Sequence, residues 1–141
     1  MKLGVMSALF AGRPLEEVCA FVASNGLTAI ELPVGAYPGQ PFFDPRRVLA
    51  SAPEQRRIRS LLADHGLSLS GLAVHGNPVH PSRGVARDHH SAFETAVKLA
   101  PCLGTDIVIT FSGCPGGARG DKSPNWVTCP WPGDFLDTLR Y

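Results

Sequence analysis

The chain alternates between two hydrophobic periods, and the alternation repeats about every forty residues. Three segments, 14–26, 51–66 and 88–104, have apolar residues at helical spacing. Each of them ends at a glycine suited to a left-handed helix cap, namely Gly26, Gly66 and Gly104. Short apolar runs flank these segments: KLGVM, LTAIELPV, LSLSGLAVH and TDIVITF. The pattern therefore predicts the order β-α-β-α-β-α-β.

Each predicted helix has one apolar face, which should pack against the sheet. Pro14 suits the first turn of the first helix, and Ser51 with Glu54 has the spacing of a capping box. Pro101 should bend or end the last turn of the third helix, because it has no N–H to donate. The apolar faces are Leu15, Val18, Phe21 and Val22 in the first helix, Ile58, Leu61 and Leu62 in the second, and Phe93, Ala96, Val97 and Ala100 in the third.

Strands that alternate with helices form a parallel sheet through right-handed crossovers, which fits an open doubly wound sheet or a (β/α)8 barrel. The dinucleotide-binding open sheet needs G-x-G-x-x-G after its first strand, where this chain has SALFAGRPLEE. The 13-residue loop 35–47, GAYPGQPFFDPRR, favours the barrel, which builds its site from the loops that follow its strands.

A complete barrel needs about 250 residues, whereas this chain has 141. The chain provides three βα units and a fourth strand, and DFLDTLRY at 134–141 has the pattern of a helix just beginning. We therefore expect residues 1–141 to form one domain, a truncated, partial (β/α)8 TIM barrel with about four parallel strands and three helices. It would correspond to the N-terminal half of a barrel.

Composition narrows the possible partners. The net charge is +1, whereas proteins that bind nucleic acid or membrane surfaces usually carry a strong basic excess. The N-terminus has neither the apolar core of a secretory signal nor a membrane span, so a cytoplasmic location is expected. The basic cluster at 56–59 lies in a helical pattern and is interpreted as a solvated face. The four cysteines form no C-x-x-C pair and are expected to be free thiols, with Cys19 and Cys102 in the core.

The glycine-rich segment FSGCPGGARGDKSPNWVTCPWP, residues 111–132, follows the fourth predicted strand. It does not match a P-loop, because Asp121 interrupts the glycine–lysine pair and no amphipathic helix follows at once. Cys114 and Cys129 lie 15 residues apart, whereas structural zinc usually takes four ligands in two close pairs. We interpret the segment as a loop at the active-site end of a barrel.

Polar residues at two strand ends are candidates for substrate contacts. His75 ends the third strand, and Asn77 and His80 follow in the loop. An imidazole at the carboxyl end of a barrel strand can bind a metal, donate a hydrogen bond to a sugar hydroxyl or transfer a proton, and it can equally be a loop-capping residue. Glu31 at the end of the second strand needs either a function or an ion-pair partner, because burying a charge is unfavourable.

Other titratable residues have simpler interpretations. His89 and His90 are adjacent at a helix start, point about 100° apart, and are interpreted as solvent-facing. His65, next to a capping glycine, is interpreted as a helix-end cation. Asp106 opens the fourth strand at the opposite end of the sheet, where barrels place stabilising rather than catalytic residues.

The sequence resembles the xylose-isomerase-like TIM barrels of the sugar phosphate isomerase/epimerase superfamily. The resemblance lies in KLGVMSALF, GLTAIELPVGAYPG, GLSLSGLAVHGNPVHP and TDIVITFSGCPGG, and it covers the whole chain but only the first half of the family's barrel. FSGCPG and NWVTCPWP look like marks of an isomerase/epimerase subgroup. The resemblance implies a metal-dependent enzyme that isomerises or epimerises sugars or polyols by moving a proton next to a carbonyl.

The resemblance also implies a divided site. The family's metal ligands, two glutamates, an aspartate and a histidine, come from strands five to eight. We therefore expect no metal in this chain, no assigned catalytic residue and no activity of the isolated chain. A divalent ion, Mn, Mg, Co or Zn, would belong to a full-length protein. The residues expected to contact the sugar or polyol are Glu31, His75, Asn77, Ser112 and Cys114.

Two alternatives stay open. The apurinic endonucleases of the same superfamily use histidines that end strands three and four as zinc ligands, whereas the fourth strand here ends in Phe111-Ser112. A half-barrel binding or scaffold protein is the other alternative, because the open edges of the first and fourth strands invite self-association. Neither a nucleic acid nor a membrane is expected as a partner.

Overall fold

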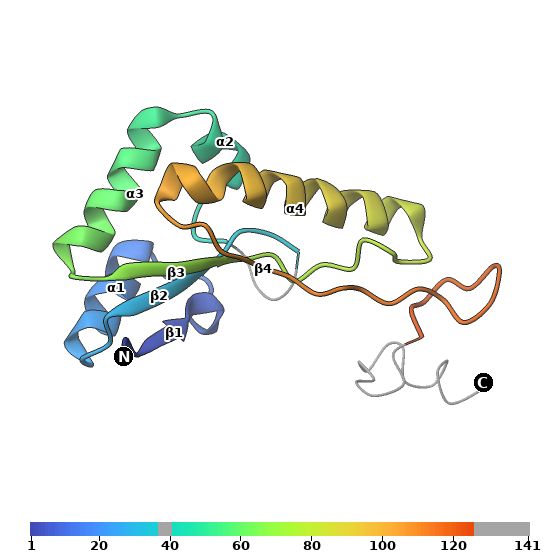
Figure 1. Cartoon of the computed structure of the whole chain (residues 1–141), viewed down its shortest axis with the longest axis horizontal. Helices are drawn as coiled ribbons and strands as arrows, with labels where there is room; N and C mark the ends of the chain where they lie inside the picture. The colour runs from blue at the N-terminus through green and yellow to red at the C-terminus, as the bar shows by residue number, and fades with distance from the viewer. Residues whose placement is uncertain (37–40, 126–141) are drawn as a thin grey trace.

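The sheet of the computed structural model has four parallel strands, and their order in space is their order in the sequence (Figure 1). The structure describes residues 1–36 and 41–125. Such a sequential parallel sheet is what part of a (β/α)8 barrel requires, as the sequence predicts. The strands are β1 (Gly4–Met6), β2 (Ala29–Pro33), β3 (Ser68–Ala73) and β4 (Val108–Ile109).

Helices connect these strands at the predicted places. The three glycines expected to end helices all have positive φ, 75° at Gly26, 65° at Gly66 and 87° at Gly104. The Ser51 hydroxyl accepts a hydrogen bond from the Glu54 N–H at 3.4 Å, as a helix cap should. The helical elements in the described residues are η1 (a 3-10 helix, Ser7–Phe10), α1 (Leu15–Ser24), α2 (Pro45–Leu49), α3 (Ala52–Asp64) and α4 (Arg83–Leu103).

Two helix boundaries differ from the prediction. The segment 35–47, predicted as a loop, contains the start of α2, so the part of the chain that the structure describes has four α-helices instead of the three predicted. Asp44 explains this start, because its carboxylate accepts hydrogen bonds from the N–H groups of Arg46 (2.9 Å) and Arg47 (3.2 Å). α4 begins at Arg83, five residues before the predicted start, and ends two residues after Pro101.

The hydrophobic core lies between the helices and one face of the sheet. Ile30, Leu32 and Val34 point into this layer from the central strand β2 and its continuation. The side chains at the intervening positions point to the other face, as the two-residue period of a strand requires. The helical part of the core consists of Leu15, Val18, Cys19, Val22, Val48, Ile58, Leu62, Ala96, Leu99, Ala100 and Leu103.

Three residues predicted in the core differ from that expectation. Phe21 is 48% exposed and packs edge-to-face on Phe10 of η1, with 5.5 Å between ring centres, because Cys19 takes the inner position on α1. Val97 is 46% exposed on the outer side of α4, where Leu99 occupies the core instead. Cys102 is only half-buried, and its thiol donates to the Lys98 carbonyl at 3.4 Å.

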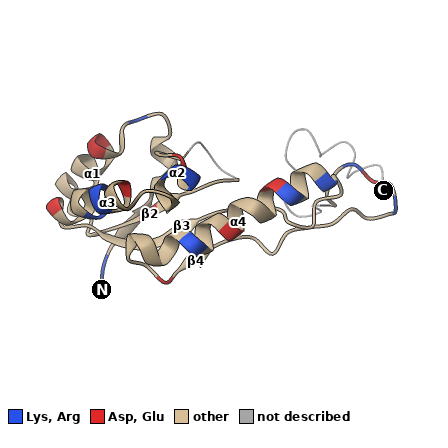
Figure 2. Cartoon of the chain, turned by 90° about the horizontal axis from the view of Figure 1, so that it is seen from above, with Lys and Arg blue, Asp and Glu red and all other residues tan. Residues whose placement is uncertain are grey.

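Many of the charged residues lie on the helices, with both signs interspersed, and others lie on the strands and loops (Figure 2). Arg57, from the basic cluster at 56–59, contacts Glu16 of α1 at 2.7 Å and Glu54 of its own helix at 3.3 Å. The cluster is therefore a solvated face with local ion pairs, as predicted. No helix among the described residues has the length and apolar character needed to cross a membrane.

Candidate functional site

The segments that follow β3 and β4 lie against each other beyond the carboxyl end of the sheet. The chain after β4 runs out past the sheet on the side where α4 begins (Figure 1). A Cβ atom added to Gly113 would lie 2.6 Å from the Asn77 Oδ1 and 2.9 Å from a Val79 methyl. Gly113 also has a φ of 87°, so both its backbone and its neighbours require glycine. This contact joins two of the predicted site segments.

Asn77 is the centre of this contact. Its side chain is buried, with 4% exposed, and its Nδ2 donates to the Cys114 carbonyl at 2.7 Å. Its Oδ1 accepts from the N–H groups of Cys114 (3.0 Å) and Val79 (3.3 Å). Because one amide pairs with both backbone groups of Cys114, it fixes the position and the orientation of that loop. We call this set of contacts the Asn77 clamp.

His89 belongs to the Asn77 clamp, and the prediction that it faces solvent is wrong. The Asn77 backbone N–H donates to its Nδ1 at 2.8 Å. A Cβ atom on Gly76 would lie 2.9 Å from the His89 Cβ and 3.2 Å from the Ala36 Cβ. Helix α4 and the segments that follow β2 and β3 are therefore in close contact here. Ala36 has a φ of 60°, which is unusual for a residue with a side chain. Such strain is often found near functional sites.

His75 and Phe111 form a stacked pair at the same end of the sheet. The ring centres are 4.6 Å apart and the ring planes are inclined by 22°. The β3–β4 register places Ala73 beside Ile109, and both rings lie two residues further on. They therefore lie on the sheet face away from the helices, with Phe111 49% exposed. Phe111 was missed in the sequence, although the alternation of Ile107, Ile109 and Phe111 places it on this face.

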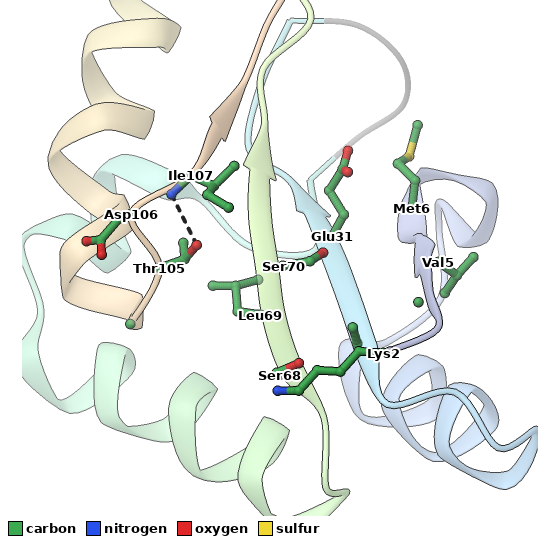
Figure 3. A pocket seen from close by; sticks show the side chains of 13 residues that line it. Lys2, Val5, Met6, Glu31, Ser68, Leu69, Ser70, Thr105, Asp106 and Ile107 are labelled. Atoms are coloured by element: carbon green, nitrogen blue, oxygen red, sulfur yellow. Dashed lines mark hydrogen bonds between the residues drawn. The ribbon is translucent and has the colours of Figure 1, made fainter.

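Glu31 lies inside β2 rather than at its end, which corrects the prediction. The strand continues for two residues to Pro33, and Glu31 pairs in register with Met6 and Gly71. Its carboxylate points toward the carboxyl ends of the strands from the sheet face opposite the core (Figure 3). The side chain is half-buried. The Glu31 carboxylate is therefore directed toward the candidate site from a position two residues before the end of β2.

The remaining predicted site residues lie in the segment after β4. Ser112 is exposed. The Cys114 thiol donates to the Asn125 carbonyl at 3.2 Å, and so helps to close the loop between these residues. Asp121 accepts from the Ala118 N–H at 2.7 Å and takes part in a turn with it. The described part of this segment thus contains the turn between Ala118 and Asp121.

The other histidines follow their simpler interpretations. The His80 Nδ1 accepts a hydrogen bond from the Ser82 N–H at 3.0 Å, so His80 caps its own loop, which is the simpler of its two interpretations. The exposed His90 approaches Glu94 at 3.4 Å. His65 occupies the C-cap position of α3. His65 and His90 lie outside the Asn77 clamp, whereas the His80 N–H donates to the Asn77 carbonyl at 3.2 Å.

The described residues do not form a cage for a metal ion. Within 1–36 and 41–125, no group of three or more His, Cys, Asp or Glu side chains is arranged to hold one. Cys129 and the segment 134–141 lie outside the described residues. The residues that the structure describes therefore do not fit the divalent ion that the resemblance implies, and we assign no reaction step to a metal.

Comparison with known proteins extends the fold assignment. No protein-family model matches the chain. The chain is similar to the uncharacterized protein YfiH of Bacillus subtilis (strain 168), with 29% identity over 143 residues that cover 100% of this chain and 45% of YfiH. It thus spans about half the length of this curated relative.

Two solved structures are similar in fold. A xylose isomerase-like TIM barrel/4-hydroxyphenylpyruvate dioxygenase fusion protein superposes with a TM-score of 0.56 and 21% identity, over 86% of this chain and 18% of that one. D-psicose 3-epimerase, solved in the presence of D-fructose, gives a TM-score of 0.51 and 18% identity, over 78% of this chain and 37% of that one. The chain therefore has the fold of part of a xylose isomerase-like TIM barrel.

Proposed function

We propose that this chain forms the substrate-contacting part of a sugar isomerase or epimerase barrel. The single observation that carries the proposal is the stacked His75–Phe111 pair at the carboxyl end of the sheet. This end is where enzymes with this fold bind their substrates. The likeness to D-psicose 3-epimerase supports a ketose as the ligand class.

The residues at this end suit a sugar chemically. The half-exposed Phe111 ring offers an apolar face for the C–H groups of a sugar, and the His75 imidazole offers a donor or an acceptor for a hydroxyl. The Asn77 clamp holds the neighbouring loop in one conformation, so less ordering is needed when a ligand binds. The Glu31 carboxylate is directed toward the same end and offers an acceptor for a hydroxyl (Figure 3).

Turnover would need more than these residues provide. Epimerisation moves a proton next to a carbonyl, which requires an acid and a base and, by the resemblance, a divalent ion that polarises the oxygens. Glu31 is one carboxylate, and no metal cage exists among the described residues. We therefore propose that this chain binds the sugar and that further carboxylates complete the catalytic site.

Binding is tested by titrating D-fructose into the isotope-labelled chain and following the ring resonances of His75 and Phe111. We expect saturable shifts of both rings. Phe111→Leu should weaken the apparent affinity about fivefold, since an aromatic contact contributes about 1 kcal/mol. Phe21→Leu is the matched control, because Phe21 is equally exposed but lies on α1. No saturable shift, or equal weakening by both variants, would reject the proposal.

The catalytic part of the proposal has a separate test. The 141-residue chain is incubated with D-fructose and Mn²⁺, and the epimer is measured by chromatography. We expect no conversion above a protein-free control. Metal-dependent conversion would show that this chain holds a complete catalytic site, and would contradict the division of the site.

A further inference from the structure

His89 lies near the start of α4, where this helix contacts the segment that follows β3. That segment runs along the amino-terminal part of α4 (Figure 1). A Cβ atom on Gly76 would lie 2.9 Å from the His89 Cβ and 3.2 Å from its Cγ. Gly76 does not have a positive φ, so the approach of α4, and not the backbone conformation, requires a glycine there. The chain therefore leaves room at Gly76 for the His89 side chain.

The hydrogen bond from the Asn77 N–H to the His89 Nδ1 determines which ring nitrogen carries the proton. The Nδ1 accepts at a distance of 2.8 Å. A neutral imidazole has one donor nitrogen and one acceptor nitrogen, whereas a protonated imidazole has two donors. The bonded His89 ring is therefore neutral, with its proton on Nε2. Toward Asn77 it acts as an acceptor whose position is fixed by the helix.

Asn77 links this acceptor to the segment that follows β4. Both of its backbone groups are bonded, the N–H to His89 and the carbonyl to the His80 N–H at 3.2 Å. The side-chain amide then bonds the carbonyl and the N–H of Cys114 at 2.7 and 3.0 Å. Cys114 is three residues after Phe111 in the same segment. A series of hydrogen bonds thus connects α4 to the segment that carries the Phe111 ring.

The Asn77 N–H has little opportunity to replace this partner. Asn77 is buried and has little access to water, so loss of the His89 acceptor would leave its N–H without a hydrogen bond. The backbone of Asn77 would have to move to find another acceptor, and its side-chain amide would move with it. Because hydrogen bonds weaken when they are misaligned, this movement should weaken both bonds to Cys114.

We infer that His89 is a positioning residue for the sugar site at the carboxyl end of the sheet. Through its Nδ1 it holds Asn77, and through Asn77 it sets the position of the segment that carries Phe111. The consequence for sugar binding rests on the proposed function, whereas the effect on this segment does not.

Two variants of similar shape separate positioning from packing. Asn and Leu side chains both branch at Cγ, and the Asn Oδ1 takes the place of the His Nδ1, whereas Leu has a methyl group there. Leu is also the better helix former of the two. A merely structural role in α4 therefore favours His89→Leu, and a positioning role favours His89→Asn. The two roles predict opposite orders.

The first measurement is hydrogen exchange of the isotope-labelled chain without sugar. In His89→Leu the amides of Asn77 and Cys114 should exchange at least about fivefold faster than in the wild type, and in His89→Asn they should stay within about twofold. His90→Leu is the matched control and should change neither rate, since His90 is exposed. Unchanged rates in His89→Leu, or equally fast rates in His89→Asn, would overturn the inference.

Gly76→Ala tests the same contact from the other side, and decides the question if His89→Leu does not fold. The new methyl group would meet the His89 Cβ, which is fixed by the helix, so the segment and α4 would have to separate. Gly84→Ala is the matched control, because the Ser82 Oγ is 3.8 Å from its new Cβ. Only Gly76→Ala should accelerate exchange at Asn77 and Cys114. Equal rates in the two alanine variants would contradict the inference.

The second measurement is the affinity for D-fructose, followed by the ring resonances of His75 and Phe111. His89→Leu should weaken binding about threefold or more, and His89→Asn should stay within about twofold of the wild type. If the wild type does not bind D-fructose, the proposed function fails, and the exchange rates still decide whether His89 positions the segment. If the wild type and His89→Leu bind D-fructose equally well, His89 does not position the sugar site.

Discussion

The layer between the helices and the sheet differs from the carboxyl-end loops in what holds it together. Among the described residues the layer contains no buried ion pair, and it is packed from aliphatic side chains such as Ile30, Val22 and Leu99. The carboxyl-end loops contain few buried apolar side chains and are held by the Asn77 clamp. In the layer, many interchangeable contacts act together. In the loops, a few directional hydrogen bonds decide the conformation.

This difference predicts how far the destabilisation caused by a substitution should extend through the structure. A cavity in the layer weakens every element that packs on it, because the helices share one core. Loss of the clamp frees two loops that make few other buried contacts. Substitutions in the layer should therefore promote unfolding of the whole domain, whereas substitutions in the clamp should promote local unfolding of the loops.

The largest expected effect is a cavity in the layer. Ile30→Ala should lower the free energy of unfolding by about 3 kcal/mol, because Ile30 is fully buried in the central strand. Urea denaturation measures the change. Val97→Ala is the control and should change stability by less than about 0.5 kcal/mol, since this side chain is on the surface. Equal losses in the two variants would contradict the described core.

Alkaline pH should weaken the layer through Cys19. Burial, with a smaller contribution from Glu16, raises the pKa of the Cys19 thiol from 9.0 to about 11. The folded chain therefore keeps this proton in a pH range where the unfolded chain loses it. Stability should fall by roughly 2 kcal/mol as the pH rises from 9 to 11, and this group should have little effect well below pH 9, where both states keep the proton.

The variant Cys19→Ala isolates this contribution, because other groups titrate in the same range. Its stability should decline less steeply than that of the wild type between pH 9 and 11 in parallel urea titrations. Parallel declines in the two proteins would mean that the Cys19 thiol is not protected.

Loss of the Asn77 clamp should be a smaller and more local effect. Asn77→Ala leaves the N–H and carbonyl of Cys114 without their partners and should cost about 1 to 2 kcal/mol. Hydrogen exchange should accelerate in 113–125 and stay unchanged in β2. Asn25→Ala is the control, because the Asn25 amide bonds only one exposed carbonyl on α1. Uniform acceleration over the whole chain would place the clamp in the core.

The smallest expected effect is at the surface. Arg57→Ala should change stability by less than about 1 kcal/mol, since its ion pairs with Glu16 and Glu54 are exposed to solvent. The change should shrink further when the salt concentration is raised. A loss comparable to that of Ile30→Ala would mean that this pair does more than the described contacts explain.

Much of the layer could be predicted from the sequence. Helical periodicity and the capping glycines depend on residues a few positions apart, and these patterns located α1, α3, α4 and the four strands. The errors have physical causes. Phe21 and Val97 satisfy the periodicity. However, the Phe21 ring packs on Phe10 at the surface, and Leu99 occupies the core position expected for Val97. The short helix α2 depends on a single cap, Asp44.

The candidate site was less predictable, because its contacts join distant parts of the chain. Asn77 was predicted at the site, but its partner Cys114 is 37 residues away and His89 is 12 residues away. No short-range pattern distinguishes His89, which points inward, from its exposed neighbour His90. Glu31 was placed at a strand end because the length of β2 cannot be determined from apolar residues alone.

The most direct test of the account is hydrogen exchange of the wild type with and without saturating D-fructose. We expect slower exchange in 75–82 and 111–116, where the His75–Phe111 pair and the Asn77 clamp meet, and no change in β2. The Phe111→Leu variant should lose this protection. Absence of protection in the wild type, or protection confined to the open hollow that Lys2 and Asp106 line at the amino-terminal ends of the strands, would contradict a sugar site at the carboxyl end of the sheet.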